Sequence, residues 1–264
     1  MLPAVDTHVH LFARHLRPVQ GARYVPAYEA RIESLFGLQE ASGVTHAVLV
    51  QPSFLGTDNS HLLAALEAHP TRLRATLVVD TDVPRASIRR WDDLGARGIR
   101  LNLFRMESVP DFSAPEWRAL FSSIAAYGWH VEVHASDAQM DKAVALLGAC
   151  PAPLVFDHFG RPGPASGAQS ARTQALLGMA AHQSIFIKLS APYRMAGGDA
   201  RQHARFWLER LGAERLMWGS DWPWTNFEQS TTYAECVSEL ARWVPDEADR
   251  RRILWDTPKR LFRF

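Results

Sequence analysis

The sequence has little cysteine and no long apolar run, and each shortage excludes a class of protein. Cys150 and Cys236 are the only cysteines in 264 residues, too few for a disulfide-stapled secreted scaffold. No uncharged apolar stretch approaches the roughly 20 residues of a membrane-spanning helix. The N-terminus lacks the basic and apolar regions of a signal peptide. We therefore expect a soluble, cytoplasmic protein.

The chain also lacks an excess of charge of either sign. Its net charge is +1, so composition gives no reason to expect nucleic acid or an anionic membrane as a partner. Lysine is scarce, with 3 residues, and the other 26 of the 29 basic residues are arginine. The hydrophobic fraction of 47% is too high for a disordered chain.

Short apolar or β-branched segments alternate with amphipathic segments along the whole chain. The predicted strands are Ala4–His10, His46–Gln51, Leu73–Asp80, Gly98–Leu103, Trp129–Ala135, Leu154–His158, Ile185–Ser190 and Leu216–Asp221. The predicted helices include Asn59–His69, Ala114–Tyr127, Ala138–Ala149, Arg201–Leu211 and Tyr233–Trp243. Alternation predicts a parallel α/β sheet, and eight such units in about 250 residues predict a (β/α)8 TIM barrel. We expect one domain over residues 1–264. A doubly wound open sheet is the alternative, but no G-x-G-x-x-G motif follows a strand.

Polar residues gather at the C-terminal ends of the predicted strands, where barrel enzymes carry their catalytic groups. His8 and His10 end the first strand and share a face, because side chains alternate along a strand. His134, His158 and Asp221 end the fifth, sixth and eighth strands. We predict that all five side chains converge in one pocket.

Each of these residues also has a structural interpretation. The histidines can be solvated loop residues or satisfied core residues, and His134 can belong to a buried polar network with Glu132 and His130. Lys188, inside the seventh strand, is expected to pair with Glu132 or Asp6. Asp221 can be a helix N-cap, but the tryptophans around it suggest a low-dielectric setting that raises its pKa and suits it to be a general base.

Three arginines follow the C-terminal ends of predicted strands. Arg105, Arg161 and Arg194 fall after strands four, six and seven. A guanidinium binds a carboxylate through two parallel hydrogen bonds, so three of them at one mouth favour a small polyanionic substrate. The alternative for any one of them is a solvated surface arginine.

Several segments resemble a known family. DTHVHLF at 6–12, FDHFG at 156–160, GSDWP at 219–223 and TPKRLF at 257–262 resemble the amidohydrolase 2 branch of the amidohydrolase superfamily. VQPSFLGTDN at 50–59, GIRLN at 98–102 and KLSAPYR at 188–194 are most similar to 2-pyrone-4,6-dicarboxylate lactonases, with sugar lactonases as nearer relatives than decarboxylases. The resemblance departs at Trp224, where the group commonly has histidine.

The resemblance implies a hydrolase that opens a small anionic lactone. Asp221 would activate water, and histidines would polarise the ring carbonyl, either directly or through one divalent ion such as zinc or manganese. The implied metal ligands are His8, His10, His158 and Asp221, and His134 matches the fifth-strand ligand of the superfamily. The implied substrate-binding residues are Arg105, Arg161, Arg194, Tyr193 and Ser53. No Glu or Lys that could bridge two metals occurs in Gly98–Leu103, so we expect at most one metal, and catalysis without metal stays open. The alternatives are a metal-dependent decarboxylase of the same branch and a barrel that has lost catalysis.

Overall fold

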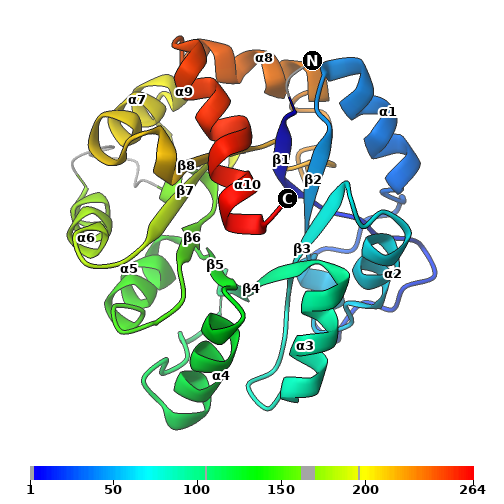
Figure 1. The fold of residues 1–264 in the computed structure, drawn as a ribbon, viewed down its shortest axis with the longest axis vertical. Coiled ribbons are helices and arrows are strands. Elements are labelled where there is room, and N and C mark those ends of the chain that lie inside the picture. The colour runs from blue at the N-terminus through cyan, green and yellow to red at the C-terminus, as the bar shows by residue number, and fades with distance from the viewer. Residues whose placement is uncertain (1–2, 105, 162–169, 196) are drawn as a thin grey trace.

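The computed structural model of the protein describes residues 3–104, 106–161, 170–195 and 197–264. Eight parallel strands follow one another in chain order, and helices surround them (Figure 1). The first and last strands approach through a parallel bridge between Val9 and Trp222, with a 2.8 Å hydrogen bond from the His10 N–H to the Trp222 carbonyl. This arrangement confirms the predicted (β/α)8 barrel.

The strands are short and the helices are of ordinary length. The strands are β1 Val5–Val9, β2 His46–Val50, β3 Leu73–Leu77, β4 Ala96–Asn102, β5 His130–His134, β6 Leu154–Phe156, β7 Ile185–Ser190 and β8 Leu216–Gly219. The helices between strands are α1 Ile32–Ser42, α2 Ser60–Ala68, α3 Arg85–Leu94, α4 Pro115–Ala126, α5 Asp137–Leu146, α6 Ala171–Ala180 and α7 Ala200–Leu211. The chain ends with α8 Tyr233–Trp243, α9 Glu247–Arg251 and α10 Thr257–Phe262.

Seven of the eight predicted strands run past the observed C-terminal end, and in β6 and β8 the overrun of two residues includes a candidate site residue. β6 ends at Phe156 and β8 ends at Gly219, so the predictions that they extend to His158 and Asp221 are wrong. Both of these residues adopt left-handed backbone conformations, with φ of 53° at His158 and 61° at Asp221. A positive φ breaks the strand and is uncommon for residues other than glycine, and such positions cluster at functional sites.

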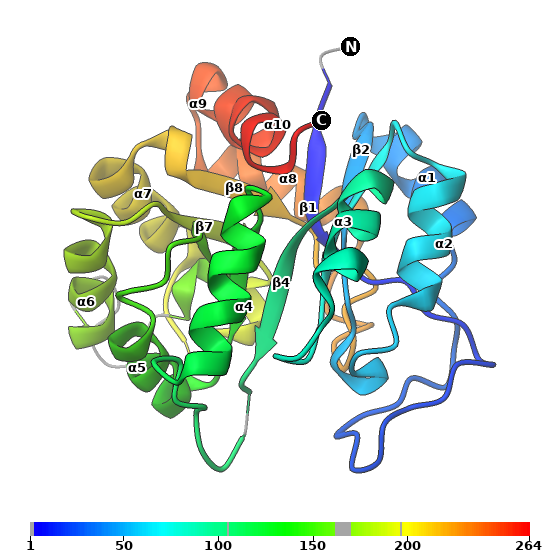
Figure 2. The same ribbon diagram turned by 60° about the horizontal axis from the view of Figure 1, so that its bottom comes forward.

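The bottom of the barrel is apolar. Val5, Val48, Val155, Phe186 and Met217 form a buried cluster there with Leu261 and Phe262. The last two belong to α10, which lies across this end of the barrel (Figure 1). The C-terminal helix therefore closes the end of the barrel through apolar contacts, and it leaves the other end for the loops (Figure 2).

A layer of buried charges lies above this apolar cluster. β4 and β5 pair so that Arg100 is beside Glu132 and Asn102 is beside His134. Lys188 on β7 reaches across to Glu132, while Arg100 donates to Asp157 at 2.8 Å. The predicted Lys188–Glu132 pair is thus confirmed. Of the network predicted among His130, Glu132 and His134, His130 lies 3.7 Å from Glu132, whereas His134 lies beside Asp157 instead. Asp6 is held elsewhere, by the backbone N–H groups of His8 and Ser220 and by the hydroxyl of Tyr233.

Within the described ranges, no helix is both long and apolar enough to cross a membrane.

Gly98 offers a test of the close packing inside the barrel. A Cβ at this position would overlap with the buried imidazole of His130, its neighbour on β5. We expect Gly98→Ala to lower the free energy of unfolding by about 1–3 kcal/mol, as overpacking does. Gly178 in α6 is a matched control, because a Cβ there would meet open space. Gly178→Ala should raise stability by about 0.5–1 kcal/mol. Urea unfolding of both variants checks this, and equal effects would contradict the steric argument.

Candidate active site

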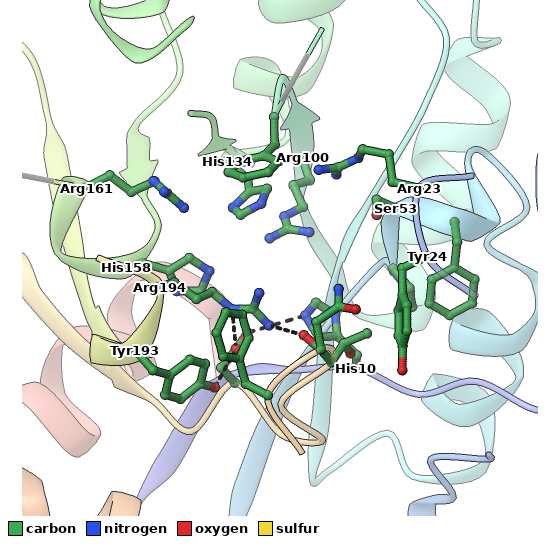
Figure 3. A pocket seen from close by; sticks show the side chains of 17 residues that line it. His10, Arg23, Tyr24, Ser53, Arg100, His134, His158, Arg161, Tyr193 and Arg194 are labelled. Carbon is green, nitrogen blue, oxygen red and sulfur yellow. Dashed lines mark hydrogen bonds and ion pairs between the residues drawn. The ribbon is translucent and has the colours of Figure 1, made fainter. Parts of the chain in front are cut away.

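A cavity of about 450 Å³ opens at the C-terminal end of the strands. Its walls come from β-strand ends and from the loops that follow them (Figure 3). The lining residues are His10, Arg23, Tyr24, Pro52, Ser53, Phe54, Arg100, Phe104, His134, His158, Arg161, Tyr193, Arg194, Asp221, Thr225, Asn226 and Phe227.

The cavity brings together most of the residues that the sequence singled out. His10, His134, His158, Asp221, Arg161, Arg194, Tyr193 and Ser53 all line it. His8 is fully buried, and its ring centroid lies 5.0 Å from those of both His10 and His158. Arg105 lies outside the described residues.

Asp221 is held by only one of its two carboxylate oxygens. Tyr193 Oη and Arg194 Nε both donate to Oδ2, each at 2.7 Å. The other oxygen, Oδ1, is buried and has no hydrogen-bond partner among the described residues. It lies 3.6 Å from His8 Nε2 and 3.7 Å from His10 Nε2. One oxygen therefore fixes the carboxylate, and the other faces the histidines.

The prediction that the site raises the pKa of Asp221 is wrong. Burial does oppose ionisation of this carboxyl, but the adjacent Arg194 guanidinium holds its pKa well below the usual range. The positive charge of Arg194, which follows β7, lowers the pKa of Asp221 and outweighs the effect of burial that the tryptophans suggested. Tyr193 and Arg194, predicted to bind substrate, bind Asp221 in this structure, and Arg194 Nη2 also donates to the Thr225 carbonyl at 2.9 Å.

His10 points the other edge of its ring toward Asp221. Its Nδ1 lies 2.8 Å from the carbonyl oxygen of Val50. Because a carbonyl can only accept, Nδ1 carries a proton, and in the neutral form of the ring Nε2 is an acceptor. In that form His10 Nε2 and Asp221 Oδ1 are two acceptors 3.7 Å apart. Such a pair is suited to bind a water molecule that donates to both, or a cation.

Burial keeps three histidines of the site neutral. It lowers the pKa of His8 to about 4, because the opposing charges of Asp157 and Lys188 largely offset each other. Burial, assisted by Arg100, lowers the pKa of His134 well below its ordinary value. Burial also lowers that of His158, despite Asp221 nearby. Neutral imidazoles can accept hydrogen bonds or ligate a metal.

The donor atoms fit one divalent ion. His8, His158 and Asp221 each place a ligand atom within 4.8 Å of the others, and all three are buried. A second group of this kind is His134, Asp157 and His158. His10 belongs to neither group, and its place in the ligand set implied by the resemblance stays a prediction. Arg100 Nη2 lies 3.5 Å from His8 Nε2, so a fixed positive charge already stands beside this triad.

Several lining residues were not predicted as site residues. Arg100 lies in the GIRLN segment, and its alternation with Gly98 and Asn102 could have placed it inside the barrel. Arg23 and Tyr24 lie in the long segment after β1, where no local pattern distinguishes them. Trp224, the departure from the family pattern, donates from its indole N–H to the Ser220 carbonyl at 3.1 Å and so braces the loop after β8.

Comparison with known proteins identifies the family. The sequence pattern of the amidohydrolase family, Amidohydro_2, matches residues 5–264, so the chain belongs to this family.

Three relatives narrow this class. The chain is 26% identical to a 4-sulfomuconolactone hydrolase of Rhizobium radiobacter, over 98% of this chain and 89% of the relative. It is 26% identical to a 2-pyrone-4,6-dicarboxylate hydrolase of Comamonas testosteroni, over 98% and 90%. A crystal structure of a probable 2-pyrone-4,6-dicarboxylic acid hydrolase from Acinetobacter baumannii with citric acid bound is 32% identical. It aligns over 99% of both chains with a TM-score of 0.92.

More distant structures show the fold alone. An amidohydrolase from Burkholderia multivorans with bound zinc is 23% identical, with a TM-score of 0.81. A 2,6-dihydroxybenzoate decarboxylase from Rhizobium is 14% identical, with a TM-score of 0.72. Decarboxylases are therefore more remote from this chain than the lactone hydrolases.

The neutral histidines predict how activity and stability depend on pH. Because the folded pKa of His8 is about 4, against 6.5 unperturbed, folding favours the neutral ring. The free energy of unfolding should then fall as pH drops from 6.5 to 4, by about 3 kcal/mol for His8. Turnover that uses the neutral His8 ring should stay level from pH 6.5 downwards and decline only as the pH approaches 4, because the folded pKa sets the protonation of the native site. Urea unfolding and kcat/KM across this range check both. A loss of kcat/KM on raising the pH through 6.5 would instead require a histidinium.

Proposed function

We propose that the protein hydrolyses a small anionic lactone. The observation that carries this proposal is the unpaired Oδ1 of Asp221, which faces His10 Nε2 inside a pocket lined by arginines. Four described arginines, Arg23, Arg100, Arg161 and Arg194, line the cavity. Arg194 pairs with Asp221 and Arg100 pairs with Asp157, while Arg23 and Arg161 add positive charge at the wall, which favours an anionic substrate. The relatives named as 4-sulfomuconolactone and 2-pyrone-4,6-dicarboxylate hydrolases support the same class of substrate.

Asp221 Oδ1 and His10 Nε2 are the groups we assign to water activation. A water molecule between them donates one hydrogen to each acceptor and presents its oxygen lone pair to the lactone carbonyl carbon. As the C–O bond forms, Asp221 takes the proton, and the carbonyl electrons move onto oxygen. Collapse of the tetrahedral intermediate breaks the ring C–O bond, and the proton on Asp221 passes to the leaving oxygen. The products are a carboxylic acid, which loses its remaining proton to solvent, and a hydroxyl or enol.

The pocket also supplies groups for the developing negative charge and for the substrate. His158, whose Nδ1 shares a 2.9 Å hydrogen bond with Ser190 Oγ, lies beside His8 on the floor of the site. We assign polarisation of the carbonyl to His158 and the Arg100 guanidinium. Arg161 and Ser53 line the cavity and are assigned to the substrate anion, as is Arg105 from the sequence prediction. Arg194 and Tyr193 act first by holding Asp221.

A divalent ion is compatible with the donor set but is not required by this scheme. His8, His158 and Asp221 would hold one zinc or manganese ion, which would supply Lewis acidity for the carbonyl oxygen. His10 and His134, the other histidines at the mouth, would then flank the substrate.

Replacement of Asp221 tests the assignment of the base. Asp221→Asn keeps the shape of the side chain but removes the acceptor for the water proton, so kcat/KM for lactone hydrolysis should fall by about 10²–10⁴-fold. A panel that includes 2-pyrone-4,6-dicarboxylate and aldonolactones, followed by ring absorbance or acid release, measures this. Asp82→Asn, at an exposed position, is the control and should match the unaltered protein. Release of CO₂ instead of uptake of water would move the assignment to a decarboxylase.

Chelation tests the need for a metal. Because Arg100 already places a positive charge 3.5 Å from His8 Nε2, we expect exhaustively chelated protein to keep most of its lactonase activity. Metal content measured on the same sample is the control. Activity that disappears on chelation and returns with one equivalent of zinc or manganese would contradict this expectation and favour the metal-assisted route.

A further inference from the structure

The wall of the cavity around Phe104 holds two arginines over one aromatic ring. The guanidinium carbon of Arg23 lies 4.7 Å from the Phe104 centroid, and that of Arg161 lies 5.0 Å from it. His134 stacks on the same ring, with centroids 5.4 Å apart and an interplanar angle of 21°. Arg23 and Arg161 reach this wall from the segments after β1 and β6, and Tyr193, a partner of Asp221, lies at the other rim of the cavity (Figure 3).

This arrangement is suited to bind an anion. A guanidinium held over an aromatic ring by the cation–π attraction keeps its positive charge and its planar set of donors, with which it can bind a carboxylate. The ring also limits the positions that the two arginines can adopt. The wall therefore presents fixed positive charge at a distance from the water site at Asp221.

Two tyrosines of the segment that carries Arg23 bind one carboxylate oxygen of Glu228. Tyr24 Oη and Tyr28 Oη each donate to Glu228 Oε1 at 2.9 Å, and the Asn226 backbone N–H donates to the same atom at 3.0 Å. These contacts join the segment after β1 to the loop after β8, which begins near Asp221. They also keep the pKa of Glu228 below its usual value against the effect of burial, so the carboxylate is ionised. Hydrogen bonds to an ionised acceptor are stronger than neutral ones.

We propose that Arg23 determines specificity for a second anionic group of the substrate, and that Glu228 is the positioning residue that holds Arg23 over the cavity. This inference rests on the proposed function, because it assigns the part of an anionic lactone that lies farthest from the reacting carbonyl. Tyr24, adjacent to Arg23 in the chain, transmits the restraint from Glu228. Loss of either residue should weaken recognition of the second anion more than it weakens ring opening.

The test compares a dianionic lactone, 2-pyrone-4,6-dicarboxylate, with a pyrone monocarboxylate. Arg23→Met should lower kcat/KM for the dianion about 10- to 100-fold more than for the monoanion, mainly through KM, because one charge-assisted contact is lost. Arg17→Met is the matched control, since Arg17 is exposed on the same segment and does not line the cavity. It should leave the ratio of the two kcat/KM values unchanged. Equal losses on both substrates for Arg23→Met would overturn the role of Arg23.

Glu228 is tested through its dependence on Arg23. Glu228→Ala should shift the same ratio in the same direction, and Glu228→Gln, which keeps an acceptor without the charge, should shift it less. The double variant Arg23→Met/Glu228→Ala should be no worse than Arg23→Met alone, because Glu228 acts through Arg23. Amide hydrogen exchange should increase over residues 14–31 in Glu228→Ala while the Tm stays near that of the unaltered protein. Additive losses in the double variant, or unchanged exchange, would overturn the positioning role.

Binding of citrate separates this inference from the proposed activity. Isothermal titration with citrate needs no turnover, and we expect Arg23→Met to weaken citrate binding about tenfold or more relative to Arg17→Met. If no lactone is hydrolysed but this difference is found, the proposed function is wrong and the role of Arg23 in anion binding is supported. If lactones are hydrolysed and the two variants bind citrate equally, the role of Arg23 is wrong and the proposed function is supported.

Discussion

The active site depends on a charge-balanced layer buried in the barrel beneath it. Lys188 and Arg100 supply two positive charges, and Glu132 and Asp157 supply two negative ones, all at nearly complete burial. A buried charge without its partner is strongly destabilising, so each member requires the others. Because the charges of this layer compensate one another, His8 experiences mainly burial, and its ring stays neutral. The layer thus fixes both the position and the protonation state of the first histidine above it.

Above this layer, positive charge is divided between two tasks. Arg194 neutralises Asp221 and keeps it ionised, which a buried carboxylate next to tryptophans would otherwise resist. Arg23 and Arg161 lie over the Phe104 ring, away from this ion pair. The same residue type therefore maintains the base at one rim of the cavity and creates an attractive surface for an anion at the other.

Much of this fold can be predicted from the sequence, but less of the site can. Short apolar and β-branched runs locate all eight strands, because a parallel barrel buries both faces of each strand. His8 and His10 are predictable because their spacing matches the strand period. Other features cannot be predicted from the sequence, because they depend on residues from other strands. These features are the turn at Asp221, the burial of Arg100 and the neutral state of the histidines. Arg194 illustrates the limit: its place after β7 is readable, but its pairing with Asp221, which reverses the expected pKa shift, arises only when β7 and β8 meet.

The loop after β8 connects the two rims of the cavity. Asp221, at its start, takes a left-handed conformation that releases the chain from β8, and Thr225 then accepts a hydrogen bond from Arg194. Glu228, seven residues beyond Asp221, fastens the segment after β1. A displacement of this loop would therefore move Asp221 and also loosen the segment that carries Arg23. We infer that this one short loop couples substrate recognition to water activation. Trp224, which stands where the group commonly has histidine, braces the loop through its indole N–H.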